Sequence, residues 1–211
     1  MCEFPGGIYA LTSETADTEQ LLTQVEAALA GGVAAVQYRD KSGDVARRHE
    51  QASELVALCH RFGVPLIVND DLRLADLTDA DGVHLGRDDG SLREARIILG
   101  KDKFIGASCY QSLELALAAQ AAGADYVAFG SFFASPTKPA APRADLDLLR
   151  EAAPVIQVSL VAIGGITLAN APQLLDAGAD SLAVLSALFD APDIRAAAHD
   201  LNQLFETESE E

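Results

Sequence analysis

Short apolar runs alternate with longer amphipathic segments along this chain, and seven of the runs end directly in a polar or glycine-rich cluster. An apolar run of four or five residues between turn residues is typical of a strand that is buried on both faces, as in a parallel sheet. The pattern predicts strands near residues 8–11, 34–38, 65–68, 82–85, 104–107, 126–129, 160–163 and 181–185.

The segments between these strands have helical periodicity and helix start signals. They predict helices near residues 18–30, 44–62, 72–78, 91–99, 112–122, 145–152, 168–177 and 191–205. Eight strand–helix units with short connections favour a single closed (β/α)8 TIM barrel, because parallel crossovers are right-handed and no strand is marked as an edge. A doubly wound open sheet is the alternative.

A short repeat supports this organisation. Residues 30–36, 122–128 and 177–183 are variants of one unit, in which a helix stops at glycine and an apolar strand follows after a short turn; residues 78–83 form a weaker fourth copy. Glycine ends a helix in the left-handed conformation without a Cβ penalty. With 211 residues, we expect one barrel domain over residues 1–205 and an acidic, disordered tail over 206–211.

The charge balance narrows the range of partners. The chain carries 32 acidic and 15 basic residues, a net charge of −17. Nucleic acids and anionic membranes are bound by clustered Lys and Arg, so neither is expected as a partner. Three widely spaced cysteines without metal-binding spacing, and the absence of a long apolar run, predict a cytoplasmic protein. Whether it forms homo-oligomers stays open.

Two carboxylates follow neighbouring strands. Asp70 comes after the third predicted strand and Asp88 after the fourth. The carboxyl ends of barrel strands form one rim, where active sites lie. Two carboxylates there can hold Mg²⁺, which keeps several waters and completes its coordination with substrate phosphates. An aspartate after a strand is also a common helix cap or turn residue, but the pairing beside Asn69 and near Lys41 favours the metal site.

Three further groups at the same rim fit anionic ligands. Gln37, Arg39 and Lys41 alternate along the end of the second strand, so they share a face if the strand continues. Gly164-Gly165 and Ser186 close the last two strands, where backbone N–H groups often bind phosphate, although the glycine pair fits a tight turn equally well. His84 is more simply a packed core histidine than a base, and Cys109 lacks an activating partner.

Taken together, six ordered motifs between residues 8 and 190 resemble the thiamine-phosphate synthase family. They are QYRDK at 37–41, VND at 68–70, DGVHLG at 81–86, SPTK at 135–138, AIGGI at 162–166 and LSA at 185–187. The resemblance implies a TIM-barrel transferase that joins a hydroxymethylpyrimidine diphosphate to a thiazole phosphate. The products are thiamine phosphate and pyrophosphate.

The resemblance also assigns roles to residues. The pyrimidine diphosphate would contact Gln37, Tyr38, Arg39, Asp40, Lys41, Asn69, Ser108 and Lys138, whereas the thiazole phosphate would contact Ser135, Pro136, Thr137, Gly165, Leu185 and Ser186. Mg²⁺ would be bound by Asp70 and Asp88. Lys138, Arg39, Lys41 and Ser108 would be catalytic, with the cations stabilising the departing pyrophosphate in a dissociative reaction that needs no general base.

The chain departs from the family pattern in places. Asp71 stands where the family usually has arginine, and Arg87 where it usually has glutamine. Arg73 or Arg87 are candidates to replace the missing arginine. Two other readings remain open: a thiazole tautomerase-like enzyme on the same barrel, and a non-catalytic phosphate-binding barrel. Retention of Asp70, Asp88 and Lys138 argues against the tautomerase.

Overall fold

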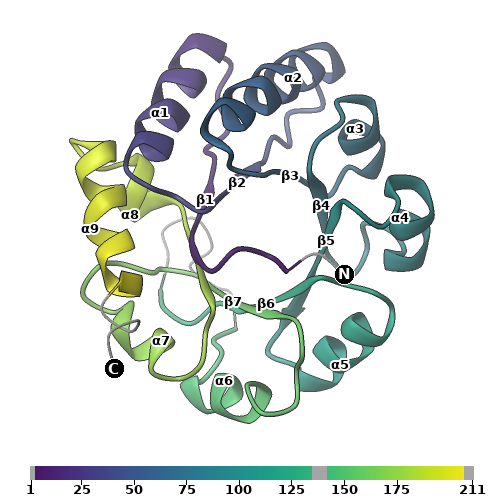
Figure 1. The fold of residues 1–211 in the computed structure, drawn as a ribbon, viewed down its shortest axis with the longest axis vertical. Helices are drawn as coiled ribbons and strands as arrows, with labels where there is room; N and C mark the ends of the chain where they lie inside the picture. Colours follow the sequence, from purple (N-terminus) through teal and green to yellow (C-terminus); the bar gives the residue numbers. More distant parts are fainter. Residues whose placement is uncertain (1–2, 135–141, 207–211) are drawn as a thin grey trace.

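The computed structural model describes residues 3–134 and 142–206. Eight parallel strands close into a barrel in chain order, with the last strand hydrogen-bonded to the first (Figure 1). This confirms the (β/α)8 barrel and excludes the open sheet. The strands are β1 (Gly7–Leu11), β2 (Ala35–Tyr38), β3 (Leu66–Asn69), β4 (Gly82–Leu85), β5 (Phe104–Tyr110), β6 (Tyr126–Gly130), β7 (Ser159–Ile163) and β8 (Ser181–Val184).

Helices surround the strands as an outer ring (Figure 1). They are α1 (Thr18–Ala30), α2 (Val45–Phe62), α3 (Leu72–Leu77), α4 (Leu92–Leu99), α5 (Leu113–Ala121), α6 (Leu146–Ala152), α7 (Pro172–Leu175), α8 (Ser186–Phe189) and α9 (Ile194–Glu206). The sequence prediction missed α8, a single turn directly after β8, and made α7 too long. Helix α9 extends to Glu206, which was assigned to the tail.

Apolar side chains form two separate cores. The larger one lies between strands and helices and includes most of the buried Val, Leu and Ile side chains. The smaller one includes Phe4, Tyr9, Ile67, Tyr126 and Val161. Phe4 stacks on Tyr126 with ring centroids 4.0 Å apart. No helix of the described residues combines the length and apolarity that crossing a membrane requires.

The sequence repeat has a structural counterpart. Asp81, Asp125 and Asp180 each precede a strand and accept a hydrogen bond from the backbone N–H near the start of the preceding strand, at 2.7–2.8 Å. Each aspartate therefore ties two neighbouring strands together at their amino ends. Asp125 is fully buried and also pairs with Arg96 at 2.5 Å. The contacts at this end of the barrel stabilise the fold, and function is expected at the opposite rim.

We expect Arg96→Ala to destabilise the protein strongly. The side chain of Arg96 donates to the carbonyls of Gly100, Lys103 and Gly123 as well as to Asp125. Its loss leaves a buried carboxylate without its cation, which costs about 3–5 kcal/mol. Urea unfolding measures the change. Arg150→Ala breaks an exposed pair with Asp147 and should cost about 0.5 kcal/mol or less; equal losses for the two variants would contradict the interpretation.

Candidate functional site

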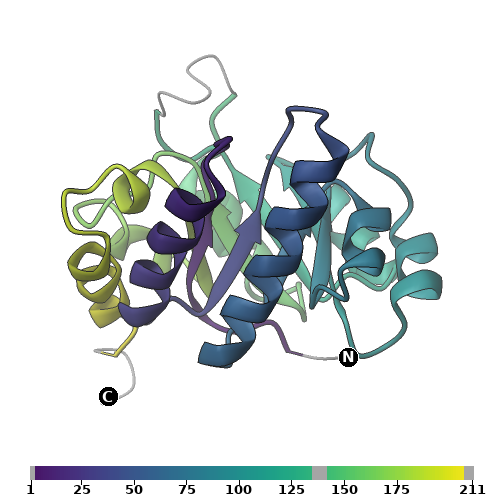
Figure 2. The same ribbon diagram turned by 90° about the horizontal axis from the view of Figure 1, so that it is seen from above.

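A cavity of about 440 Å³ opens at the carboxyl ends of β2 and β3. In Figure 2, the segment that joins β2 to α2 projects beyond the barrel at the top of the picture. The cavity is lined by Asp40, Lys41, Arg48, Asn69, Asp70, Asp71, Leu72 and Asp89. These residues come from three consecutive strand ends and from the first turns of α2 and α3, so segments far apart in the sequence meet here.

The end of β2 sends alternate side chains in opposite directions. The Gln37 side chain donates to the hydroxyl of Tyr9 at 2.7 Å, inside the barrel. The Tyr38 hydroxyl donates to Gln51 of α2 at 2.9 Å. Tyr38 therefore faces the helix rather than the barrel interior, and its expected contact with the pyrimidine diphosphate stays a prediction. Arg39 is half-buried, and its backbone N–H donates to Thr12.

Asp40 braces the loop that follows β2. One oxygen accepts from the backbone N–H of Ser42 at 2.7 Å and the other contacts Arg47 at 3.3 Å. Burial alone would raise the pKa of Asp40, but the hydrogen bonds from Ser42 and Arg47 lower it below its usual value. The Asp40 carboxylate is thus held charged at the cavity, and both of its oxygens already have partners within the protein.

A carboxylate pair forms between the ends of β3 and β4. Asp70 has a left-handed backbone with φ of 64°, and its backbone N–H donates to the carbonyl of His84 at 2.8 Å. Lys41 Nζ lies 3.1 Å from Asp70 Oδ2. Burial, together with the neighbouring Asp70 carboxylate, raises the pKa of Asp89. The partner of Asp70 in this cavity is therefore Asp89.

Asp88, expected as the second metal ligand, does not line the cavity and is exposed. The loop after β4 turns back, so that Asp89 Oδ2 accepts from the backbone N–H of Gly86 at 3.0 Å. That turn directs Asp89 toward Asp70. Periodicity identifies a strand end but not the geometry of the turn that follows it, and in this structure Asp89, rather than the expected Asp88, lies beside Asp70.

The residue that replaces the family arginine has a structural role. Asp71 caps α3, since its Oδ1 accepts from the backbone N–H of Leu74 at 2.9 Å. Its Oδ2 accepts from Arg48 Nη2 at 2.8 Å. Arg48 therefore lies in the cavity. Sequence reasoning missed it, although two adjacent arginines at 47–48 are unusual in a chain so poor in basic residues.

Neither arginine suggested as a substitute lines this cavity. Arg73 is exposed on α3. The guanidinium of Arg87 lies over the ring of Tyr110, 5.2 Å from its centroid. The cation that the fold brings to this cavity from beyond the recognised motifs is Arg48.

A chain of polar side chains crosses the barrel interior. Beyond Gln37, the Tyr9 hydroxyl meets that of Tyr126 at 2.9 Å, and the Tyr126 hydroxyl lies 3.1 Å from His84 Nδ1. His84 Nε2 then lies 2.8 Å from the hydroxyl of Ser108. Burial lowers the pKa of His84 to about 4, so its ring is neutral at pH 7. The chain connects Gln37 with Ser108; sequence analysis missed both tyrosines.

Elsewhere on the rim, the loop after β7 packs closely against the backbone that follows β6. Gly164 and Gly165 have φ of 109° and 64°. A Cβ on Gly165 would collide with the carbonyl oxygen of Ala134, so glycine is required by both conformation and space. Leu185 and Ser186 lie at the start of α8. Ser135, Pro136, Thr137 and Lys138 lie outside the described residues.

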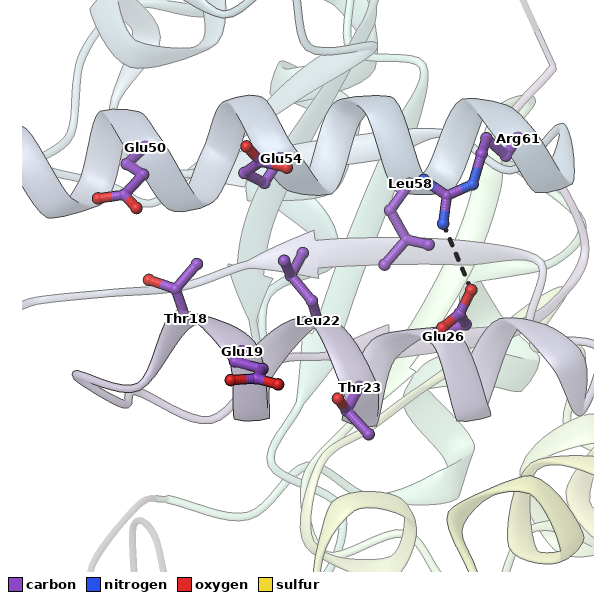
Figure 3. A pocket seen from close by; sticks show the side chains of 9 residues that line it. All are labelled: Thr18, Glu19, Leu22, Thr23, Glu26, Glu50, Glu54, Leu58 and Arg61. Atoms are coloured by element: carbon purple, nitrogen blue, oxygen red, sulfur yellow. Dashed lines mark hydrogen bonds and ion pairs between the residues drawn. The ribbon is translucent and has the colours of Figure 1, made fainter.

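A second cavity lies between α1 and α2, on the outer side of the barrel (Figure 3). Its lining includes Glu19, Glu26, Glu50 and Glu54, with Arg61 paired to Glu26 at 3.3 Å. This cavity lies between two helices, away from the carboxyl ends of the strands, where the active sites of such barrels lie. The cavity at the strand ends is therefore the candidate site.

The carboxylate pair is compatible with a magnesium ion. The described part of the chain has no group of three or more His, Cys, Asp or Glu side chains placed to hold a metal. Mg²⁺ is commonly bound by one or two carboxylates, with waters and substrate phosphates as the remaining ligands. Asp70 and Asp89 supply that minimal set, and burial together with the neighbouring Asp70 carboxylate raises the pKa of Asp89, as expected where two carboxylates lie close together.

A model of the family described as thiamine monophosphate synthase matches residues 8–188. The chain is 77% identical to the thiamine-phosphate synthase of Thiobacillus denitrificans over the full length of both, and 54% identical to that of Methylobacillus flagellatus over 94% of this chain and 95% of the relative.

A solved structure extends the likeness to three dimensions. The thiamine phosphate pyrophosphorylase from Pyrococcus furiosus superposes with a TM-score of 0.85 at 34% identity, covering 95% of this chain and 96% of that one. On sequence and fold together, this chain belongs to the thiamine monophosphate synthase family.

Proposed function

We propose that the protein condenses 4-amino-2-methyl-5-hydroxymethylpyrimidine diphosphate with 4-methyl-5-hydroxyethylthiazole phosphate, and releases thiamine phosphate and pyrophosphate. This is the reaction for which its family is named. The observation that carries the proposal is the cavity at the rim, where the carboxylate pair of Asp70 and Asp89 adjoins Lys41 and Arg48. Metal-binding carboxylates beside cations suit a diphosphate rather than an uncharged substrate.

The proposed cofactor is Mg²⁺, bound by Asp70 and Asp89. When bound, it neutralises negative charge on the diphosphate and so makes pyrophosphate a better leaving group. Around it, Lys41 and Arg39 hold the phosphate oxygens from β2, and Asn69 does so from β3. Lys138 is proposed to stabilise the departing pyrophosphate from the loop after β6.

The buried polar chain supports the pyrimidine end of this proposal. Gln37 and Ser108 are linked through Tyr9, Tyr126 and His84. Buried side chains joined in a hydrogen-bonded network of this kind are held in fixed positions. We propose that Gln37 and Ser108 orient the aminopyrimidine, whose electron-rich ring carries the positive charge that forms as pyrophosphate leaves.

The thiazole phosphate is proposed to bind on the opposite side of the rim. Gly165, Leu185 and Ser186 present backbone there, and Ser135, Pro136 and Thr137 would complete the site. Loops after the seventh and eighth strands of such barrels frequently bind phosphate. With both substrates held, the thiazole nitrogen attacks the pyrimidine methylene carbon; the work of the protein is positioning and electrostatics rather than proton transfer.

The free cysteines bear on the cellular compartment in which the reaction takes place. Both proposed substrates are small phosphorylated molecules, and the described cysteines, Cys59 and Cys109, are free and buried. Free thiols fit a reducing compartment, and we propose that the enzyme acts in the cytoplasm.

Incubation of the purified protein with both substrates and Mg²⁺ tests the proposal. We expect thiamine phosphate and pyrophosphate in equal amounts, measured by mass spectrometry and by a phosphate assay after pyrophosphatase. Omitting the thiazole phosphate should abolish thiamine phosphate formation. A folded protein that gives no more product than the enzyme-free mixture would refute the assignment and favour a barrel that only binds phosphate.

A further inference from the structure

We propose that Arg48 is a further binding residue of this site, which holds the terminal phosphate of the pyrimidine diphosphate and of the pyrophosphate product. The proposal rests on the function proposed above. It concerns a residue outside every recognised motif of the chain, brought to the cavity by the first turn of α2.

The position of Arg48 is fixed by the fold. Its side chain is 18% exposed and lines the same cavity as Lys41, Asp70 and Asp89. Asp71, which is itself held in place as the cap of α3, accepts from Arg48 Nη2. An arginine anchored in this way loses little conformational freedom when it binds a ligand.

Much of the hydrogen-bonding capacity of Arg48 is unused. Within the described residues, Asp71 is the acceptor that its guanidinium contacts, and Arg48 Nε is buried without a hydrogen-bond partner. A guanidinium has five N–H donors in a planar fork that matches the oxygens of a phosphate. Arg48 Nε is shut off from solvent, so the donors that an incoming phosphate oxygen can meet are those of the terminal nitrogens, of which Asp71 engages Nη2.

The acidic lining of the cavity makes a cation necessary beside Asp71 if a diphosphate is to bind there. Asp40, Asp70, Asp71 and Asp89 line the cavity, against Lys41 and Arg48. Mg²⁺ on Asp70 and Asp89 would free Lys41 from Asp70 for a phosphate. Asp71 remains, and it would repel the terminal phosphate unless Arg48 stood between them. We infer that Arg48 is the cation that makes the β3 side of the cavity compatible with a diphosphate.

The competing explanation is that Arg48 and Asp71 only fasten α2 to α3. The two roles differ in what Asp71→Asn should do. Asparagine caps a helix as well as aspartate does, but it removes the negative charge that engages Arg48. If Arg48 binds phosphate, Asp71→Asn should strengthen pyrophosphate binding; if the pair is only a fastener, Asp71→Asn and Arg48→Ala should have the same effect.

Pyrophosphate binding in the presence of Mg²⁺, measured by titration calorimetry, provides the test. For Arg48→Ala we expect a dissociation constant about ten- to a hundredfold above that of the parent, the range for loss of a charge-assisted hydrogen bond. Arg48→Lys should recover part of the affinity, because it keeps the charge and loses the fork. Asp71→Asn should lower the dissociation constant about two- to tenfold.

Arg61→Ala is the matched control. Arg61 is on the same helix and pairs with a carboxylate, Glu26 (Figure 3), but it lies in the other cavity. Its loss should leave pyrophosphate affinity unchanged. The Michaelis constants add a second readout: Arg48→Ala should raise that of the pyrimidine diphosphate and leave that of the thiazole phosphate near the parental value.

Pyrophosphate binding and product formation test the role of Arg48 and the proposed function separately. If the parent forms thiamine phosphate and Arg48→Ala binds pyrophosphate as tightly as the parent, the role of Arg48 is refuted and the function stands. If pyrophosphate binding depends on Arg48 but no thiamine phosphate forms, the binding residue stands and the function is refuted. Should Arg48→Ala not fold, Arg48→Lys and Asp71→Asn decide; unchanged binding in both would overturn the proposal.

Discussion

Replacing either Asp70 or Asp89 by alanine should lower turnover by about a hundredfold or more. The two carboxylates line the same cavity, close enough that Asp70 raises the pKa of Asp89, and Asp70 already attracts Lys41 at 3.1 Å. Without one of them, Mg²⁺ would be bound by a single carboxylate, and stabilisation of the departing charge by a metal is worth several kcal/mol. Steady-state rates as a function of Mg²⁺ concentration measure the loss, together with direct titration of Mn²⁺ as a paramagnetic substitute.

Asp88→Ala is the control for this experiment. It removes a carboxylate one position away, on an exposed residue that does not line the cavity. Its turnover and metal affinity should stay near those of the parent, and all three variants should unfold at similar temperatures. If Asp88→Ala loses activity while Asp89→Ala retains it, the metal is bound as the sequence alone predicted and the turn after β4 rearranges on binding.

Lys138→Ala should also lower turnover by roughly a hundredfold, the scale observed when one preorganised electrostatic donor is removed. Lys138 lies outside the described residues, and the prediction comes from its motif and from the prolines at 136 and 139, whose fixed φ angles limit the backbone entropy lost on binding. Lys138→Arg should recover only part of the rate, since a planar fork does not replace a compact ammonium. Steady-state kinetics on both variants measure these changes.

The control is Lys101→Ala, an exposed lysine just before β5, at the opposite end of the barrel. A surface lysine contributes about 0.5 kcal/mol or less to stability and nothing to catalysis, so Lys101→Ala should match the parent. If Lys138→Ala kept near-parental turnover, Lys138 would be a surface lysine without a catalytic role. Stabilisation of the departing pyrophosphate would then depend on the metal, Arg39 and Lys41.

Most of the architecture could be predicted because it depends on local patterns. Buried strands and glycine-terminated helices are written into short stretches, and a barrel follows when eight such units succeed one another. The differences arose where tertiary contacts decide. The helix expected over 168–177 is reduced to α7 (Pro172–Leu175). Asn170 Oδ1 accepts from the backbone N–H of Thr167 in the turn before it, and Pro172 has no N–H with which to continue a helix out of that turn.

The candidate site divides in the same way. Gln37, Lys41, Asn69 and Asp70 were identifiable as polar residues at the ends of predicted strands, and all lie at the rim or point into the barrel. Tyr38 could not be separated from its neighbours until the structure showed its hydroxyl donating to α2. Alternation along a strand determines that neighbours face opposite ways, but not which of the two sets faces the ligand.

By itself, the sequence determined the barrel and the family, and it predicted a site at the carboxyl ends of the strands. These follow from periodicity and from motifs of a few consecutive residues. Only the tertiary structure decided that Asp89 rather than Asp88 faces Asp70, and that Arg48 enters the cavity. Tyr9, Tyr126 and His84 likewise connect Gln37 to Ser108 only in the folded barrel. Such contacts join side chains from different strands and helices, and their distances depend on turns and crossovers that no local pattern encodes.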